Sequence, residues 1–477
     1  FIFFYQEIIR TKLSSDLFKF YLSNNWLEAI EKNSTTKIRH IDGEVKNYAS
    51  YIFTFIKLIN ETIISFFLII ILAIVNIKIL LLNLSILIAF AFFYLFVIRR
   101  KFIELNSSRY KTNLSFLSIL QDTFRSLKDI KVLQKEKYFQ KKFNTINEFY
   151  KNIIVKVNTF SILPRYFLEP IIVLILVSII FILHNSQTEN SQMLIMLGIY
   201  SVVLFRIFPA ASKVITNIQL LTGGTPVIKV VFDDFEKAIK DLTLDKTLKS
   251  KDISFQNQIE IRNLNFKYKT KERGNLLKNI NLKINKGSSI GVIGPSGSGK
   301  STFVNIILGL IKQDSGKILV DGNEINNLSL EWKKIIGFVP QDINLINGTL
   351  LNNIILNFED DFDEVRMNEA INLSQLKNFV DNLSNGLNTH LGDFGYKISG
   401  GQKQRIGIAR AIYKRPSIIV LDESTNSLDI NLEKEIIQNI VNIKQNYSSI
   451  IISHRESTIE KCDHVYRINN GEIEKIK

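Results

Sequence analysis

A glycine-rich run in the second half of the chain has the composition of a phosphate-binding loop. It follows the apolar segment Ser289–Ile293 and precedes the helix-forming segment Phe303–Leu310. Glycines let such a loop turn its amides inward, and the N-terminus of the next helix attracts anions. Lys300 can then reach β- and γ-phosphates, and the Ser301 hydroxyl can coordinate Mg²⁺. The run reads Gly294, Pro295, Ser296, Gly297, Ser298, Gly299, Lys300, Ser301 and Thr302.

Two acidic residues end a second apolar segment, Ser417–Glu423. A buried strand that ends in Asp422 can supply another contact to Mg²⁺, and Glu423 can polarise an attacking water as general base. Taken alone, an apolar strand ending in Asp-Glu is a common structural feature. Its position downstream of a phosphate loop favours the catalytic interpretation.

A second Ser-Gly-Gly sequence lies between these two motifs. Ser399, Gly400, Gly401 and Gln402 stand where a helix is expected to begin, and such a helix start offers amides, a hydroxyl and a positive dipole end to an anion. Either the chain binds two nucleotides, or each of its phosphate motifs completes the site of a partner molecule.

Together these motifs resemble the nucleotide-binding domain of ATP-binding cassette (ABC) transporters, from about Ile259 to the C-terminus. The first run matches the Walker A loop, the acidic segment the Walker B strand, and Ser399–Gln402 the family signature, with Ile398 in place of the usual Leu. The resemblance implies ATP and Mg²⁺ as cofactors, and a head-to-tail homodimer with composite ATP sites. It further implies an adenine-stacking Tyr268, a Q-loop Gln341 that contacts Mg²⁺ and the membrane domain, a switch His454 near the γ-phosphate and a D-loop ending at Asp429.

The first half of the chain contains four apolar runs. The 36 residues Ile63–Ile98 carry one charge, Lys78, and would form a helix of about 54 Å, too long for a single crossing of a bilayer core of about 30 Å. Two helices that turn near Asn76 fit better. With the runs Phe167–Leu183 and Met193–Phe208, we expect four membrane helices, near residues 54–77, 79–98, 164–184 and 192–212.

Charge is unevenly distributed along the 477 residues. The net charge is +15, and Arg99–Arg165 alone contains 15 Lys/Arg against 5 Asp/Glu, whereas the link His184–Gln192 has no Lys or Arg. By the positive-inside rule the basic stretch is cytoplasmic. The charge therefore indicates membrane topology, with lipid as a partner and no nucleic acid. The single Cys462 excludes a disulfide framework.

The expected fold is an α-helical transmembrane domain of ABC exporter type, partial, followed by an α/β P-loop NTPase domain. We expect a transmembrane domain at 1–225 with cytoplasmic coupling turns near 33–38 and 125–132, a linker at 226–255 and a nucleotide-binding domain at 256–477. The membrane domain precedes the nucleotide-binding domain in one chain, as in exporters. The segment Thr389–Gly395 resembles an exporter motif, with Asp393 where exporters have Glu. Such exporters have six membrane helices per subunit, so we expect two to be missing at the N-terminus; a true four-helix transporter is the alternative.

The expected function is ATP-driven export or flipping in a membrane, the bacterial inner membrane by analogy, with a cytoplasmic nucleotide domain. Short stretches such as Ser126–Phe139 resemble flippases of lipid-linked oligosaccharides, which points to a lipid-linked saccharide, lipid or polysaccharide precursor. Arg125, Arg165 and Arg206 could hold a pyrophosphate head group or simply anchor helix ends. Alternatives are a multidrug or peptide exporter of the same fold, a soluble cassette ATPase acting on nucleic acid, and a regulator that binds ATP without hydrolysing it.

Overall fold

The computed structural model divides the chain into two compact units. The helical unit comprises Phe1–Asn24 and Glu28–Thr247, and the second unit comprises Asn25–Leu27 and Leu248–Lys477. The structure describes residues 2–24, 26–31, 33–185, 190–224, 232–233, 236, 253–268, 276–357, 361–392, 398–424, 430–442, 447–453, 455 and 459–477.

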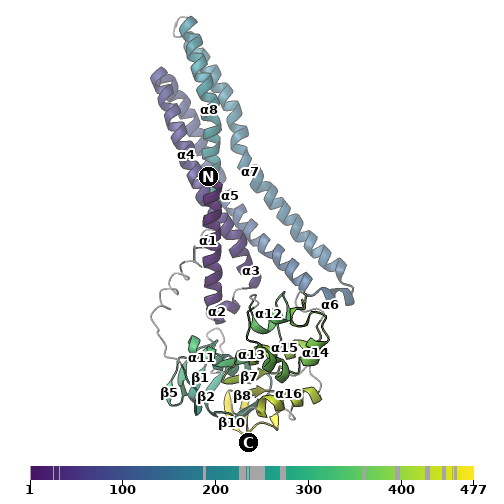
Figure 1. Ribbon diagram of the computed structural model, residues 1–477. Helices are drawn as coiled ribbons and strands as arrows, with labels where there is room; N and C mark the ends of the chain where they lie inside the picture. The colour runs from purple at the N-terminus through teal and green to yellow at the C-terminus, as the bar shows by residue number, and fades with distance from the viewer. Residues whose placement is uncertain are drawn as a thin grey trace. The chain divides into compact units, whose positions relative to one another are not determined.

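Long helices dominate the first unit (Figure 1). The helices α5 and α7 contain 49 and 50 residues, and each is therefore about 75 Å long, more than twice the thickness of a bilayer core. The elements are α1 Ile2–Ser23, α2 Trp26–Glu31, α3 Ser34–Arg39, the π-helix η1 His40–Glu44, α4 Val45–Val75, α5 Ile77–Arg125, α6 Leu127–Val132, α7 Glu136–Asn185 and α8 Asn190–Gly223.

Four of these helical stretches are long and apolar enough to cross a membrane. They are Ser34–Val75, Ile77–Ile98, Glu136–Ile182 and Met193–Gly223. Between 6% and 28% of the residues in their most apolar windows are buried, so most of this apolar surface faces outward. An apolar surface of this extent is unstable in water and stable in lipid. The helices also continue far beyond the apolar runs, as the length of the basic stretch Arg99–Arg165 allows.

Polar residues mark the breaks between the long helices. Asn76 is extended, with φ −161°, and its side chain accepts hydrogen bonds from the amides of Lys78 and Ile79 at 3.1 and 3.3 Å. This N-cap starts α5 and separates it from α4. A break at Ser126 likewise ends α5 before the short helix α6, within the stretch expected to form a coupling turn.

A six-stranded sheet forms the centre of the second unit. Its strand order is β10-β9-β3-β8-β7-β6, with β10 antiparallel to β9 and the other five strands parallel. Strands β3, β6, β7 and β8 are short and almost fully buried, as expected for strands covered on both faces. The bounds of the six strands are β3 Ser289–Ile293, β6 Ile336–Val339, β7 Ile418–Asp422, β8 Ser448–Ile452, β9 His464–Asn469 and β10 Glu472–Lys475.

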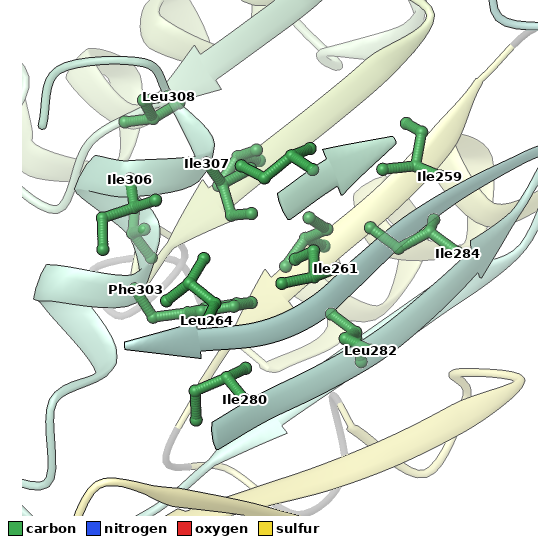
Figure 2. Packing of buried hydrophobic residues seen from close by; sticks show 14 of the residues in the cluster. Ile259, Ile261, Leu264, Ile280, Leu282, Ile284, Phe303, Ile306, Ile307 and Leu308 are labelled. Carbon is green, nitrogen blue, oxygen red and sulfur yellow. The ribbon is translucent and has the colours of Figure 1, made fainter. Parts of the chain in front are cut away.

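A second, antiparallel sheet packs against the first helix of this unit. Its order is β2-β1-β4-β5, formed by Leu277–Asn285, Gln258–Phe266, Ser315–Val320 and Asn323–Glu324. Alternate residues of β1 and β2, such as Ile259 and Leu282, join Phe303 and Ile307 of α10 in one buried cluster (Figure 2). This cluster fixes α10, Lys300–Ile307, between the two sheets.

A separate hydrophobic cluster lies under other helices of this unit. It includes Leu350, Ile371, Ile406 and Ile437, which come from α12, α13, α15 and α16. The other helices are α11 Leu330–Lys334, α12 Leu350–Ile355, α13 Glu364–Leu373, α14 Lys377–Asp381, η3 Gly386–Asn388, α15 Gly400–Tyr413 and α16 Ile430–Asn442. The predicted fold class, membrane-length helices followed by an α/β domain, is confirmed.

Trp332 on α11 is expected to be essential for the stability of the α/β unit. Its side chain is 1% exposed, and its indole N–H donates to the Ile307 carbonyl of α10 at 2.7 Å. Trp332→Ala should reduce the free energy of unfolding by about 3–5 kcal/mol, because it leaves a cavity and an unpaired carbonyl. Leu330 on the same helix is 71% exposed, so Leu330→Ala should change it by less than about 0.5 kcal/mol. Denaturant unfolding of the two variants measures the difference; equal losses would contradict the assignment.

Candidate nucleotide-binding site

The glycine-rich loop connects the end of β3 to α10. The helix begins at Lys300 and ends at Ile307, three residues earlier at each end than the expected segment Phe303–Leu310. The earlier start follows from Gly299, whose φ of +108° belongs to the left-handed region and ends the loop there. A Cβ at Gly299 would lie 2.9 Å from Cδ2 of Leu277, and one at Gly294 would lie 2.2 Å from the Ile468 carbonyl oxygen. The sequence pattern did not reveal Leu277 and Ile468, because apolar strand residues carry no motif.

The polar groups of the loop fit a triphosphate. The Lys300 ammonium donates to the carbonyls of Gly294 and Pro295 at 2.7 and 3.0 Å, so it lies across the mouth of the loop. Among the described residues, the buried Ser298 hydroxyl has no hydrogen-bond partner, which is costly unless a ligand satisfies it. Ser301 is exposed in the first turn of α10. An ammonium, an unsatisfied hydroxyl and a helix N-terminus converge here, as an anion requires.

The two acidic residues lie at the same edge of the sheet as the loop. Strand β8 separates β3 from β7, and its Ile452 pairs with both Val292 and Asp422. The backbone turns at Glu423, which has φ 48° and donates its N–H to the Ile452 carbonyl at 2.9 Å. Parallel pairing therefore places Asp422 two strands from the start of the phosphate loop, within reach of a shared ligand.

Gln341 joins this acidic edge from the neighbouring strand. It follows β6, which pairs with β7, and its Nε2 donates to Oε2 of Glu423 at 3.0 Å. The amide holds one carboxylate oxygen of Glu423 in place. The structure thus brings Lys300, Asp422, Glu423 and Gln341 to one edge.

The local electrostatics keep Asp422 sensitive to its surroundings. Burial raises the pKa of this half-buried carboxyl above its ordinary value, the adjacent Glu423 raises it further, and Lys300 lowers it. A carboxylate that is poorly solvated and lies beside another carboxylate gains most from a bound cation. This is the electrostatic environment expected of a divalent-metal ligand.

Tyr268 lies beside the same helix. It follows β1, its hydroxyl is 3.3 Å from the Thr302 hydroxyl, and its ring stands edge-on to Phe266 with centroids 4.9 Å apart. An aromatic ring next to the first turn of α10 can stack on the base of a nucleotide whose phosphates occupy the loop.

The Ser-Gly-Gly segment lies at the start of α15. This helix packs in the second hydrophobic cluster, whereas α10 packs in the first. Ser399 and Gln402 form a capping box at the start of α15, in which each side chain accepts the other residue's backbone N–H, at 3.2 and 2.9 Å. The amides of Gly400 and Gly401 in the first turn stay directed out of the helix end. Ser399 and Gly400 are exposed, so an anion has access to this end.

Two residues expected at the site lie outside the described residues. These are His454 and Asp429. Asp393 and residues 237–252 of the expected linker also lie outside the described residues. Their assigned roles remain predictions.

Gly299→Ala should weaken binding of a fluorescent ATP analogue at least about tenfold. An L-residue at this φ costs roughly 1–2 kcal/mol, and the added Cβ displaces the Leu277 side chain. The matched control is Gly386→Ala, at a glycine with φ 49° and open space around it, which should lower stability by about 1 kcal/mol and leave affinity unchanged. Equal loss of affinity in both variants would show that the loop geometry is not responsible.

Comparison with known proteins agrees with this geometry. The sequence profile of the ABC transporter family matches residues 277–426. A multidrug resistance ABC transporter ATP-binding and permease protein of Lactococcus lactis is 30% identical over 380 residues, 78% of this chain and 62% of its own length. An ATP-dependent lipid A-core flippase of Ralstonia nicotianae is 36% identical over 221 residues, 46% of this chain and 37% of its own length.

A solved structure extends the similarity to the helices. A bacterial Atm1-family ABC exporter with ATP bound superposes with a TM-score of 0.82 at 20% identity, covering 98% of this chain and 82% of that one. At this identity the match concerns the fold. The chain itself spans 62% or less of the length of the two relatives named above. Residues 277–426 are therefore an ABC transporter domain, and the helices that precede this domain make the chain an integral membrane protein.

Proposed function

We propose that this protein is an ATP-hydrolysing exporter or flippase. The observation that carries the proposal is the convergence of Lys300, Asp422, Glu423 and Gln341 at one sheet edge, in a chain with four membrane-length helices. We assign residues 1–225 to the transmembrane domain, 226–255 to the linker and 256–477 to the nucleotide-binding domain. The coupling turns are residues 33–38 and 125–132.

Each of these site residues has a separate role in ATP binding and hydrolysis. The loop amides and Lys300 hold the β- and γ-phosphates, and Tyr268 stacks on the adenine. Ser301, Gln341 and Asp422 would hold Mg²⁺, which would neutralise phosphate charge. Glu423 orients a water and accepts its proton as the water attacks the γ-phosphorus, the bond to the β–γ bridging oxygen breaks and ADP leaves. Gln341 keeps the Glu423 carboxylate directed toward that water. His454 contacts the γ-phosphate in this assignment.

A second copy of the chain completes each site. The exposed start of α15, with Ser399, Gly400, Gly401 and Gln402, belongs to a different cluster from α10 and offers a further set of anion-binding groups. In a head-to-tail homodimer it covers the phosphates held by the partner's loop, and Asp429 lies at the same interface. ATP binding then draws the two cassettes together, and hydrolysis lets them separate.

The transported compound is proposed to be a lipid-linked saccharide, a lipid or a polysaccharide precursor. One relative is named a lipid A-core flippase, which supports an amphiphilic substrate, and another is named for multidrug resistance, which keeps a drug or peptide exporter as the second candidate. We place the protein in a bacterial inner membrane with its nucleotide-binding domain in the cytoplasm, on the side of the basic stretch Arg99–Arg165.

Glu423→Gln tests the assignment of the general base. The variant should bind ATP as well as the parent protein and hydrolyse it at least about 10²-fold more slowly, because the amide cannot accept the proton. Phosphate release and nucleotide binding are measured on the full chain in detergent. Glu474→Gln, an exposed carboxylate on β10, serves as the matched control and should hydrolyse ATP normally. Turnover near the parent rate in Glu423→Gln would refute the mechanism.

Membrane extraction tests the exporter against a soluble ATPase. The chain should stay in the membrane pellet after high-salt and carbonate washes, because most of the apolar surface of its long helices faces outward. Release by carbonate, together with ATP hydrolysis stimulated by nucleic acid, would support the soluble alternative instead.

A further inference from the structure

A proline in the middle of α7 leaves a backbone carbonyl without its usual helical partner. Pro164 lies inside this helix, and it has no N–H to donate to the carbonyl of Phe160, four residues earlier. In a membrane protein such a carbonyl must be satisfied by a neighbouring group, because lipid offers no hydrogen bonds.

Two side chains from two other helices donate to this carbonyl. The Tyr94 hydroxyl of α5 lies 2.8 Å from the Phe160 oxygen, and Nε2 of Gln219 in α8 lies 3.1 Å from the same atom. Tyr94 is 4% exposed and Gln219 2% exposed. One carbonyl thus joins three helices, α5, α7 and α8, which belong to the same unit (Figure 1).

Apolar clusters enclose the junction on both sides. Tyr94 packs with Leu168 and Ile215 in one cluster, and Phe160 packs against a second cluster that includes Phe102 and Val157. Both clusters draw their residues from α5, α7 and α8. Burial among apolar side chains strengthens the two hydrogen bonds and makes the loss of both costly.

The other two prolines in these helices lack this arrangement. Pro170 in α7 and Pro209 in α8 deprive the carbonyls of Tyr166 and Phe205 of a donor in the same way. Within the described residues, no side chain from another helix donates to either carbonyl, and both side chains are exposed, at 63% and 86%. The junction is therefore specific to Pro164.

We propose that Tyr94 and Gln219 are positioning residues that fix the direction of α7 at Pro164 by sharing the Phe160 carbonyl. The junction lies where the apolar run of α7 meets its basic cytoplasmic part, since Arg165 follows directly and the residues before it belong to the basic stretch. It sets the angle between the two parts of α7. A fixed bend would carry movement of the nucleotide-binding domain to the membrane helices, and this consequence rests on the proposed function. The two hydrogen bonds to the Phe160 carbonyl do not depend on that function.

A substitution cycle with Pro164 tests the shared carbonyl. Tyr94→Phe removes only the hydroxyl and should raise hydrogen exchange of the α7 amides flanking Pro164 about fivefold. Pro164→Ala restores the helical donor to Phe160, so Tyr94→Phe in that background should change exchange less than about twofold. Pro209→Ala is the matched control, and in its background the effect of Tyr94→Phe should remain about fivefold. Equal effects of Tyr94→Phe in the parent protein and in the Pro164→Ala background would overturn the proposal.

A second experiment leaves Pro164 unchanged and removes both hydrogen-bond donors. Gln219→Met keeps the length of the side chain and removes its donor. One remaining donor holds the carbonyl less firmly than two, but only the loss of both leaves it without a partner, so Tyr94→Phe combined with Gln219→Met should raise exchange more than the product of the single effects. A purely multiplicative result would mean that the two side chains act independently, and the proposal would fail.

Spin labels measure the positioning role directly. Glu148 and Val177 are exposed on α7 on opposite sides of Pro164 and can carry the labels. Their distance distribution should be narrow in the parent and clearly broader in the double variant Tyr94→Phe, Gln219→Met; an unchanged width would refute a positioning role. These readouts on the full chain in detergent need no ATP hydrolysis, so failure of the proposed function would not affect them.

Discussion

The nucleotide site depends on the order of strands in the six-stranded sheet. The phosphate loop and the acidic pair are more than 100 residues apart in sequence, and neither can act alone. The parallel strand β8 lies between β3 and β7 and pairs with both, so Val292, Ile452 and Asp422 are level across the sheet. Because parallel strands end at a common edge, the loop after β3 and the carboxylates after β7 necessarily share that edge. Gln341, after β6, reaches the same edge for the same reason.

The loop can present its polar groups because apolar packing fixes what lies behind them. Phe303, Ile306 and Ile307 of α10 are buried against the antiparallel sheet, which holds the helix start and hence Lys300. Close contacts from Leu277 and Ile468 leave no room for side chains at two of the loop glycines. Burial also raises the pKa of Asp422, so the same packing that orders the site prepares its carboxylate for a cation.

In the helical unit the corresponding constraint is that each backbone N–H and C=O group needs a hydrogen-bond partner. Long helices satisfy their own amides, so polar side chains are needed only where a helix ends or is interrupted. Asn76 caps α5 at the break after α4, and Tyr94 with Gln219 supplies the bonds that Pro164 removes from α7. Asn76, Tyr94 and Gln219 are thus each tied to an interruption of the helical hydrogen-bond pattern.

Local pattern determined much of this protein. The sequence pattern predicted the phosphate loop, the acidic strand end and the Ser-Gly-Gly helix start, because each works mainly through neighbouring residues. Apolar run lengths predicted the membrane helices and the break at Asn76. The expected helix start at Phe303 was late, since the φ of Gly299 cannot be read from the sequence. Only the tertiary structure decided that Gln341 binds Glu423, that Tyr268 lies against Thr302 and that two helices share the Phe160 carbonyl. These pairs join residues 34 to 82 positions apart in the sequence, and sheet order and helix packing, not local pattern, bring such residues together.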